Sequence, residues 1–220
     1  MSANSRLSQG NWIMSVYSEL VFPRLMDWAM SDPVLTKYRQ EVLSEVSGQV
    51  FEIGFGTGLN LSYYPKHLQK LTTIDVNPGM NYVVKKRINE SEITVDFRVL
   101  NGESLPMADN SFDSVVSTWT LCSITKVNQA IEEIYRVLKP GGKFFFIEHG
   151  ISDESKVQVW QNRLTPLQKI IADGCHLNRN IKQLVENHFQ ILTLEEFYEP
   201  KFPKVMGYMY KGVAQKSCEH

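Results

Sequence analysis

The stretch Val50-Phe-Glu-Ile-Gly-Phe-Gly-Thr-Gly58 places three alternating glycines directly after a short apolar run. The apolar residues predict a buried strand over 50–53, and the glycines predict a tight turn behind it. Because glycine has no side chain, it also lets a ligand approach the backbone closely. The stretch therefore predicts either a ligand-binding turn or a purely structural one, and other parts of the chain must decide between them.

Apolar segments that alternate with helical patterns surround this turn. Strands are predicted at residues 50–53, 71–76, 95–100, 112–118 and 143–148, and helices at 59–69, 79–90 and 127–138. Such alternation indicates an α/β fold with right-handed βαβ crossovers and a parallel sheet. Ligands of such sheets bind at the carboxyl ends of the strands, which is where the glycine turn lies.

The two ends of the chain have other patterns. Over residues 12–30, aromatic and aliphatic side chains predict two short amphipathic helices with Pro23 as a break between them. Asp32 and Pro33 predict the start of a helix over 33–46. The C-terminal part predicts a helix at 155–172, a polar turn at 173–180, a helix to about residue 187, and neighbouring antiparallel strands at 190–198 and 205–214.

Composition narrows the class of protein. The chain has 220 residues, 43% hydrophobic and 21% charged, as expected for a soluble globular domain, and its net charge of -1 gives no reason to expect a nucleic-acid partner. No apolar run approaches the roughly 18 residues that span a membrane, and the N-terminus lacks a secretory pattern. The three cysteines include no CxxC pair, which predicts no disulfide framework and no structural zinc. We expect a cytoplasmic protein.

A second element strengthens the ligand-binding interpretation of the glycine turn. Asp75 ends the next predicted strand, 17 residues after Gly58. An acid at this position can accept hydrogen bonds from both hydroxyls of a ribose. The alternative is a structural role in an Asx turn or helix cap around Asn77. The glycine turn and the acid together are a much stronger signal for a nucleotide-type ligand than either one.

The surrounding residues discriminate between nucleotide ligands. No Gly-Lys-Ser/Thr follows the turn, which excludes a P-loop. The dinucleotide fingerprint needs its third glycine further along the chain, where Leu59 stands after Gly58. Glu52 lies next to the turn, and a carboxylate suits a ligand with an ammonium and a sulfonium better than a pyrophosphate.

Longer motifs resemble the class I S-adenosylmethionine-dependent methyltransferases over about residues 48–150. They are E-x-G-x-G-x-G with the second-strand Asp75, then "LNGESLPMADNSFDSVV" and "EEIYRVLKPGGKFFFIEH". The pattern "LP-x-x-D-x-S-FD-x-V" is typical of the type 11 methyltransferase domain, a branch acting on small molecules such as quinones and phosphatidylethanolamine. "STWTLCSI", "FFFIEHG" and "DGCHLNR" further resemble the microsomal alkyl-thiol S-methyltransferases.

The resemblance implies a Rossmann-like, seven-stranded and mostly parallel sheet with an antiparallel C-terminal strand. It implies a single methyltransferase domain over residues 1–220, with a helical cap at 1–46, a cofactor-binding core at 48–150, and acceptor-side helices and the last two strands at 151–220. The cofactor implied is S-adenosyl-L-methionine, with S-adenosyl-L-homocysteine as product.

The resemblance also implies the residues that bind this cofactor. The loop of Glu52, Gly54, Gly56 and Gly58 would cradle it, with Asp75 on the ribose and Val76 or Asn77 beside the adenine. Asn101, Gly102 and Glu103 would meet the adenine edge, and Thr118 and Trp119 would face the methionine end and the acceptor. Tyr17 would reach the cofactor carboxylate if the N-terminal helices form a lid.

Methyl transfer needs an acceptor atom held in line with the sulfonium methyl, and a base only if the acceptor arrives protonated. The candidate catalytic residues are His149, directly after the fifth strand, and Asp173 in the polar turn. Structural alternatives are a His149 that bonds a loop carbonyl and a turn that merely covers the site. We expect no metal, because Cys175 and His176 are adjacent and no second cluster completes a site. Cys122 is expected to pack as a small hydrophobic residue.

The function predicted is methyl transfer from S-adenosylmethionine to a small, lipophilic acceptor, with a thiol favoured. Aromatic residues of the N-terminal helices would line an apolar acceptor pocket, unless they only form core. One alternative is a phospholipid amine or quinone methyltransferase at a membrane surface, without a spanning segment. A second is a non-catalytic cofactor-binding module, and a dehydrogenase is a minor one. The partners expected are small molecules, not nucleic acid.

Overall fold

A seven-stranded sheet forms the centre of the protein, in a computed structural model that describes residues 21–77 and 79–218. Its strand order is β3-β2-β1-β4-β5-β7-β6. The strands are β1 (Val50–Ile53), β2 (Lys70–Asp75), β3 (Thr94–Val99), β4 (Phe112–Thr118), β5 (Leu138–His149), β6 (Gln190–Tyr198) and β7 (Tyr208–Gln215). The first five pair in parallel, whereas β7 pairs antiparallel with both β5 and β6. The predicted α/β, Rossmann-like and mostly parallel sheet is confirmed, and β7 is its one antiparallel strand among the described residues, because β6 runs in the same direction as the first five.

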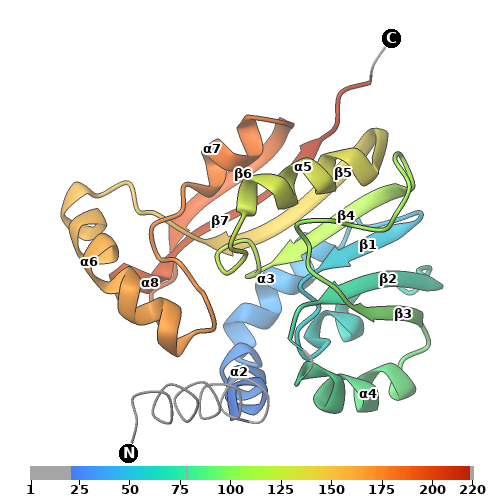
Figure 1. Ribbon diagram of the computed structural model, residues 1–220, viewed down its shortest axis with the longest axis horizontal. Helices are drawn as coiled ribbons and strands as arrows, with labels where there is room; N and C mark the ends of the chain where they lie inside the picture. Colours follow the sequence, from blue (N-terminus) through green and yellow to red (C-terminus); the bar gives the residue numbers. More distant parts are fainter. Residues whose placement is uncertain (1–20, 78, 219–220) are drawn as a thin grey trace, which may run out of the picture.

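Helices cover both faces of this sheet (Figure 1). Their bounds are α2 (Phe22–Met30), α3 (Pro33–Leu43), the 3-10 helix η2 (Leu59–Tyr63), α4 (Met80–Glu90), α5 (Val127–Val137), α6 (Ser155–Ile171), α7 (Ile181–Glu186) and α8 (Lys204–Gly207). α5 and α7 pack on one face, and α3, η2 and α4 pack on the other. α6 and α8 lie against each other beside the sheet.

The side chains of β5 show why both faces are covered. Phe144 and Phe146 join one buried cluster with Ile134 of α5, whereas Phe145 and Ile147 join a second cluster on the opposite face. Successive side chains of a strand point to opposite faces, so a continuous apolar run needs partners on both sides. The run "KFFFI" therefore predicts a central strand, and β5 has neighbours at both edges.

Local signals explain where several helices begin and end. Asp32 caps α3, since its carboxylate accepts a hydrogen bond from the Val34 amide at 2.8 Å. The helix predicted at 59–69 is wrong beyond residue 63. Tyr64 is extended there, with φ −63° and ψ 146°, because the residue before a proline (Pro65) disfavours the helical region.

Other boundaries differ less from the predictions. β5 starts at Leu138, five residues before the predicted strand, because Leu138 already pairs with Phe112 of β4. The last strand starts at Tyr208, because α8 follows Pro203 and takes the first residues of the predicted strand. Pro23 stands in the first turn of α2, and the first of the two predicted N-terminal helices lies outside the described residues. No described helix has the length and apolarity needed to cross a membrane.

Candidate active site

The glycine loop leaves β1 at the point where the strand order reverses, with β2 on one side of β1 and β4 on the other. Gly54, Gly56 and Gly58 all have left-handed backbones, with φ of 75°, 56° and 78°. A side chain at Gly54 would collide with Thr120, but a Cβ at Gly56 would meet nothing within 4 Å. The backbone of Gly56 thus faces open space at the position where parallel sheets bind nucleotides.

Asp75 ties this loop to the end of β2. Its carboxylate accepts hydrogen bonds from the amides of Gly56 at 2.7 Å and Asn77 at 2.8 Å. Burial raises the pKa of Asp75, against the two backbone hydrogen bonds, which lower it. The predicted alternative, an Asx turn at Asn77, is therefore present, and it coexists with a carboxylate that lies directly beside the open space at Gly56.

Glu52 is buried beneath the loop. Its carboxylate accepts hydrogen bonds from the side-chain amide of Asn60 and the hydroxyl of Tyr64, each at 2.7 Å. Burial raises the pKa of Glu52 to about 7, although both hydrogen bonds lower it. The Asn60 amide also donates to the hydroxyl of Thr118 at 3.0 Å. Asn60 thus joins the end of β4 to the glycine loop, and its own Oδ1 is buried without a partner among the described residues.

The remaining predicted adenine-side residues lie at the ends of β2 and β3. Val76 is exposed, with 66% of its surface accessible, and Asn77 is buried. Asn101 accepts a hydrogen bond from the amide of Glu103 through its side-chain oxygen, which forms an Asx turn. Gly102 packs against Ile53, where a Cβ would come within 2.5 Å of the Ile53 side chain. The structure therefore places Val76 and the 101–103 turn beyond neighbouring strand ends, as the sequence predicts.

Trp119 begins the loop after β4 in a strained conformation. Its φ is 51°, a left-handed value that is rare for a bulky residue and that clusters at functional sites. The guanidinium of Arg39 lies 4.8 Å from the centre of the indole ring. The indole Nε1 is buried and has no hydrogen-bond partner among the described residues.

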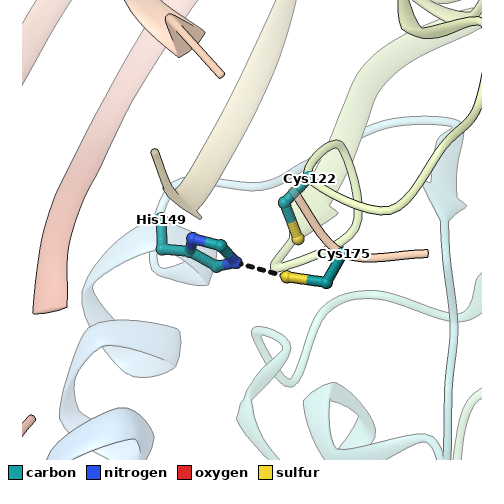
Figure 2. Close-up of side chains that lie close together, drawn as sticks. All are labelled: Cys122, His149 and Cys175. Atoms are coloured by element: carbon teal, nitrogen blue, oxygen red, sulfur yellow. Dashed lines mark hydrogen bonds between the residues drawn. The ribbon is translucent and has the colours of Figure 1, made fainter. Parts of the chain in front are cut away.

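A cluster of two thiols and an imidazole lies at the ends of β4 and β5. Figure 2 shows Cys122, His149 and Cys175 converging, with His149 Nε2 2.9 Å from the sulfur of Cys175. The three ligand-type atoms all lie within 4.8 Å of one another. Cys122 is buried among hydrophobic residues, as expected, but its thiol also lies beside two polar groups from distant segments.

Electrostatics distinguish the two thiols. The hydrogen bond from Cys175 holds the pKa of Cys122 well below its usual range, although burial opposes this. The same hydrogen bond, with burial, raises the pKa of Cys175. Burial alone would lower the pKa of His149, but the neighbouring charge on Cys122 raises it.

The predicted polar turn at 173–180 crosses the carboxyl edge of the sheet. Asp173 accepts a hydrogen bond from the side-chain amide of Asn77 at 3.2 Å, which places it at the β2 end. Cys175 instead reaches His149 at the β5 end. Asp173 and His149, the two predicted catalytic residues, are therefore each bonded elsewhere and are not paired with one another. Arg179 fastens the turn by donating to the carbonyls of Leu121 and Ile124.

Buried polar atoms without partners mark this edge of the molecule. Within residues 21–77 and 79–218 they are Arg39 Nε, Asn60 Oδ1, Trp119 Nε1, Glu148 Oε2 and His149 Nδ1. Most buried polar groups in proteins are hydrogen-bonded, so such a concentration indicates groups that a ligand completes. The open space at Gly56 and the unpaired atoms of Asn60 and Trp119 fit an S-adenosylmethionine held across the ends of β1 and β4.

Comparisons with known proteins agree with this geometry. A methyltransferase domain family profile matches residues 51–146. The thiol S-methyltransferase TMT1B of Rattus norvegicus is 35% identical over 207 residues, which cover 84% of each chain. The chain belongs to the S-adenosylmethionine-dependent methyltransferase family. Human thiol S-methyltransferase TMT1A is 36% identical over 74% of this chain and 70% of its own.

A solved methyltransferase structure shows the same fold. The N-methyltransferase NodS of Bradyrhizobium japonicum, in complex with S-adenosylhomocysteine, matches with a TM-score of 0.65 at 14% identity, over 93% of this chain and 97% of its own. The protein is thus a methyltransferase that uses S-adenosylmethionine as cofactor and acts on a small-molecule substrate. Tyr17, the last predicted cofactor contact, lies outside the described residues.

Sequence reasoning missed four residues that shape the site. Asn60 and Tyr64 hold Glu52, Arg39 lies over Trp119, and Cys122 completes the thiol and imidazole cluster. No local spacing indicates these contacts, because the partners lie 8 to 80 residues apart in the chain. The one available signal was the position of Cys122 shortly after a strand end, where parallel sheets place functional side chains.

Proposed function

We propose that this methyltransferase transfers the methyl group of S-adenosylmethionine to the sulfur of a small, lipophilic thiol. The observation that carries the proposal is the 35% identity to a thiol S-methyltransferase over 84% of both chains. S-adenosylmethionine supplies an activated methyl group on a sulfonium. The protein then has to hold the acceptor sulfur in line with that methyl and keep water away.

We assign cofactor binding to the residues predicted from the sequence. Gly56 lets the cofactor approach the backbone, and Asp75 accepts the ribose hydroxyls. Glu52 lies beneath the loop, where its carboxylate, once ionised above its raised pKa of about 7, favours a cationic ligand. Thr118 and Trp119, at the end of β4, lie beside the transferring methyl.

The acceptor side suits a thiol better than an alcohol. A thiol has a pKa near ~8.5 and ionises easily, so no strong base is required. His149 lies within hydrogen-bond distance of Cys175, and Arg179 is fastened to the adjoining loop. The positive charge of the Arg179 guanidinium favours a thiolate, and both residues lie on the same sheet edge as the glycine loop. His149 is the group that would contact the acceptor.

Apolar surface beside the cluster supports a lipophilic acceptor. A cavity of about 500 Å³ lies between α6 and the segment that carries His176, lined partly by Pro166 and Ile170. Ile170 and its neighbour Ile171 are 59% and 51% exposed. The unpaired thiols of Cys122 and Cys175 further suit a reducing compartment, so we place the activity in the cytoplasm.

The test is release of S-adenosylhomocysteine with three acceptor conditions. They are a simple alkyl thiol, phosphatidylethanolamine liposomes, and no acceptor. We expect turnover with the thiol alone, rising with the length of its alkyl chain. Turnover only with liposomes would contradict the proposal and move the activity to a membrane surface. Cofactor binding without turnover under any condition would contradict it too, and would favour a binding module.

A further inference from the structure

The cluster of Cys122, His149 and Cys175 is more than a hydrogen-bonded contact. Its three side chains come from three separate segments: the loop after β4, the last residue of β5, and the turn after α6. All three offer atoms that bind transition metals, and the two cysteines are buried. Two sulfurs and one imidazole nitrogen are a donor set that suits zinc and other thiophilic ions.

Distances within the cluster are close to those of a metal centre. Zinc binds thiolate sulfur at ~2.3 Å and imidazole nitrogen at ~2.0 Å, so tetrahedral ligands lie about 3.5–3.8 Å apart. The three atoms here lie within 4.8 Å of one another, and the shortest contact, His149 Nε2 to Cys175 sulfur, is 2.9 Å. For all three atoms to bind one ion, the shortest of these contacts would have to lengthen and the widest to shorten by up to about 1 Å.

The backbone holds the three segments in this arrangement independently of the side chains. The amide of His176 donates to the carbonyl of Cys122 at 2.9 Å, which joins the two cysteine segments directly. His149 ends a strand that is still paired with Met209 of β7 at that residue. A preorganised set of ligands of this kind binds a metal without the cost of ordering loops.

We propose that Cys122, His149 and Cys175 bind a zinc ion whose fourth coordination position is open to the sulfur of the methyl acceptor. Three protein ligands of the Cys2His type with one open position are the arrangement of catalytic rather than structural zinc. The cluster lies beside the residues assigned to the methyl-transfer site, because the Cys122 loop also carries Trp119 and Thr120. The Thr120 hydroxyl donates to the carbonyl of Gly54 at 3.3 Å, so the ion lies one short loop from the glycine turn.

The open position rests on the proposed thiol function, and the chemistry balances. The acceptor thiol loses its proton to solvent as its sulfur binds zinc as a thiolate. A lone pair of that sulfur forms the new bond to the methyl carbon, while the carbon–sulfonium bond breaks. The products are a methyl thioether and neutral S-adenosylhomocysteine. Zinc with three thiolates carries a net negative charge, which the nearby guanidinium of Arg179 offsets.

This proposal replaces the expectation that the chain binds no metal and the expectation that His149 is a catalytic acid or base. The residues around Cys175 in the sequence indicate no partner cluster, whereas the fold brings Cys122 and His149 to it from 53 and 26 residues away. His149 would then be a metal ligand rather than a general base. Its Nδ1 has no partner among the described residues, so the Nε2 contact is what orients the ring.

The first experiment measures metal alone. The full chain is purified under a thiol-free reductant, and its zinc content is determined by elemental mass spectrometry, followed by titration with zinc. We expect about one zinc per chain, with affinity at least tenfold weaker in Cys122→Ser and in Cys175→Ser. Cys218→Ser is the matched control, since Cys218 is an exposed cysteine outside the cluster and should bind zinc like wild type. Absence of zinc binding in the reduced wild type overturns the proposal.

The second experiment uses cobalt in place of zinc. Thiolate ligation should give cobalt an intense charge-transfer absorption, and an added alkyl thiol should change its visible bands as it enters the fourth position. Charge-transfer bands that keep their full intensity in Cys122→Ser would overturn the assignment of ligands, since the loss of one of two thiolates should reduce it, and bands unmoved by the thiol would overturn the open position. A chain whose mass shows a Cys122–Cys175 disulfide under reductant would also overturn the proposal.

A chelator separates this proposal from the proposed function. Wild-type protein stripped of metal should still bind S-adenosylhomocysteine, and should lose at least tenfold in thiol turnover until zinc is restored. This readout does not depend on whether the serine variants fold. Full turnover in the stripped protein supports the thiol function and overturns the zinc site. Bound zinc without thiol turnover supports the site and contradicts the thiol function.

Discussion

The two sides of this site are built differently. On the cofactor side, residues 50–60 and 75–77, both carboxylates are hydrogen-bonded within the protein, and Asn60 Oδ1 is the one buried side-chain polar atom without a described partner: Asp75 accepts from Gly56 and Asn77, and Glu52 from Asn60 and Tyr64. On the acceptor side, residues 118–124, 148–150 and 173–179, Trp119 Nε1, Glu148 Oε2 and His149 Nδ1 are buried without described partners.

The difference indicates on which side of the site a bound ligand has to complete hydrogen bonds that the protein leaves unmade. A satisfied, preorganised side can bind its ligand without rearrangement, and it changes little between free and bound states. A side with unpaired buried groups is completed only when something binds there. We therefore expect substitutions on the cofactor side to remove binding and turnover together, and substitutions on the acceptor side to remove turnover first.

The largest effect is expected at Gly56. A valine there would occupy the open space at the Gly56 backbone, so binding of S-adenosylhomocysteine should be lost in calorimetric titration. Gly141→Val is a matched control, because Gly141 also has a left-handed φ of 75° and its Cβ would meet only the Cys218 sulfur at 3.2 Å. Both variants should lose on the order of 1–3 kcal/mol of stability from backbone strain. Equal cofactor binding by Gly56→Val and Gly141→Val would place the cofactor elsewhere.

The second largest effect expected is a pH dependence of the free energy of unfolding that arises from Glu52. The folded protein keeps this carboxyl protonated up to about pH 7, whereas the unfolded chain releases the proton near 4.5. Its contribution to stability is therefore full below pH 4.5 and is lost as pH rises towards 7, by about 3 kcal/mol. Urea unfolding of wild type and Glu52→Gln at pH 5 and pH 8 should show wild type losing that amount relative to the variant. A constant difference at both pH values would contradict the buried, protonated Glu52.

A smaller loss of cofactor binding is expected when the Asp75 carboxylate is removed. Asp75→Ala should weaken S-adenosylhomocysteine binding by about 1.5–3 kcal/mol, the usual contribution of hydrogen bonds to a charged group. Asp113→Ala is the matched control, because Asp113 also accepts a backbone amide, that of Gln49 at 2.7 Å, and lies at the start of β4, away from the strand ends that form the site. If both alanine variants weaken binding equally, the effect is general loss of stability rather than loss of a ribose contact.

The smallest effect concerns α2. Asp27 of α2 pairs with Arg87 of α4 at 2.6 Å, and Arg87 also donates to the carbonyl of Thr57 in the glycine loop. Asp27→Asn should cost about 1 kcal/mol in urea unfolding, since the pair is only about a quarter exposed. Glu90→Gln, which breaks the exposed Lys86–Glu90 pair, should cost less than about 0.5 kcal/mol. Equal costs would mean that α2 is not fastened to the cofactor side.

The same contrast separates what the sequence could predict from what it could not. The glycine loop and Asp75 are encoded by local patterns, because a strand end, a turn and a second strand end follow one another in the chain. Pro33 and Asp32 marked the start of α3 correctly for the same reason. The helix predicted at 59–69 is wrong beyond Tyr63, because Pro65 disfavours the helical conformation of the residue before it.

Local patterns do not predict the contacts on the acceptor side. Cys122, His149 and Cys175 are 26 or more residues apart, and their meeting depends on how the turn after α6 crosses the sheet edge. Asp173 shows the same limit, since its position on Asn77 follows from that crossing and not from its neighbours. Single-sequence reasoning placed both segments near the site but could not say which side chains touch.

The most direct test of methyl transfer to a thiol follows the methyl group itself. The full chain is incubated with S-adenosylmethionine carrying a deuterated methyl group and a simple alkyl thiol, and products are identified by mass spectrometry. We expect the wild-type protein to form a thioether that carries the intact labelled methyl on sulfur, and we expect none from Gly56→Val. Release of S-adenosylhomocysteine without any labelled thioether would contradict methyl transfer to a thiol.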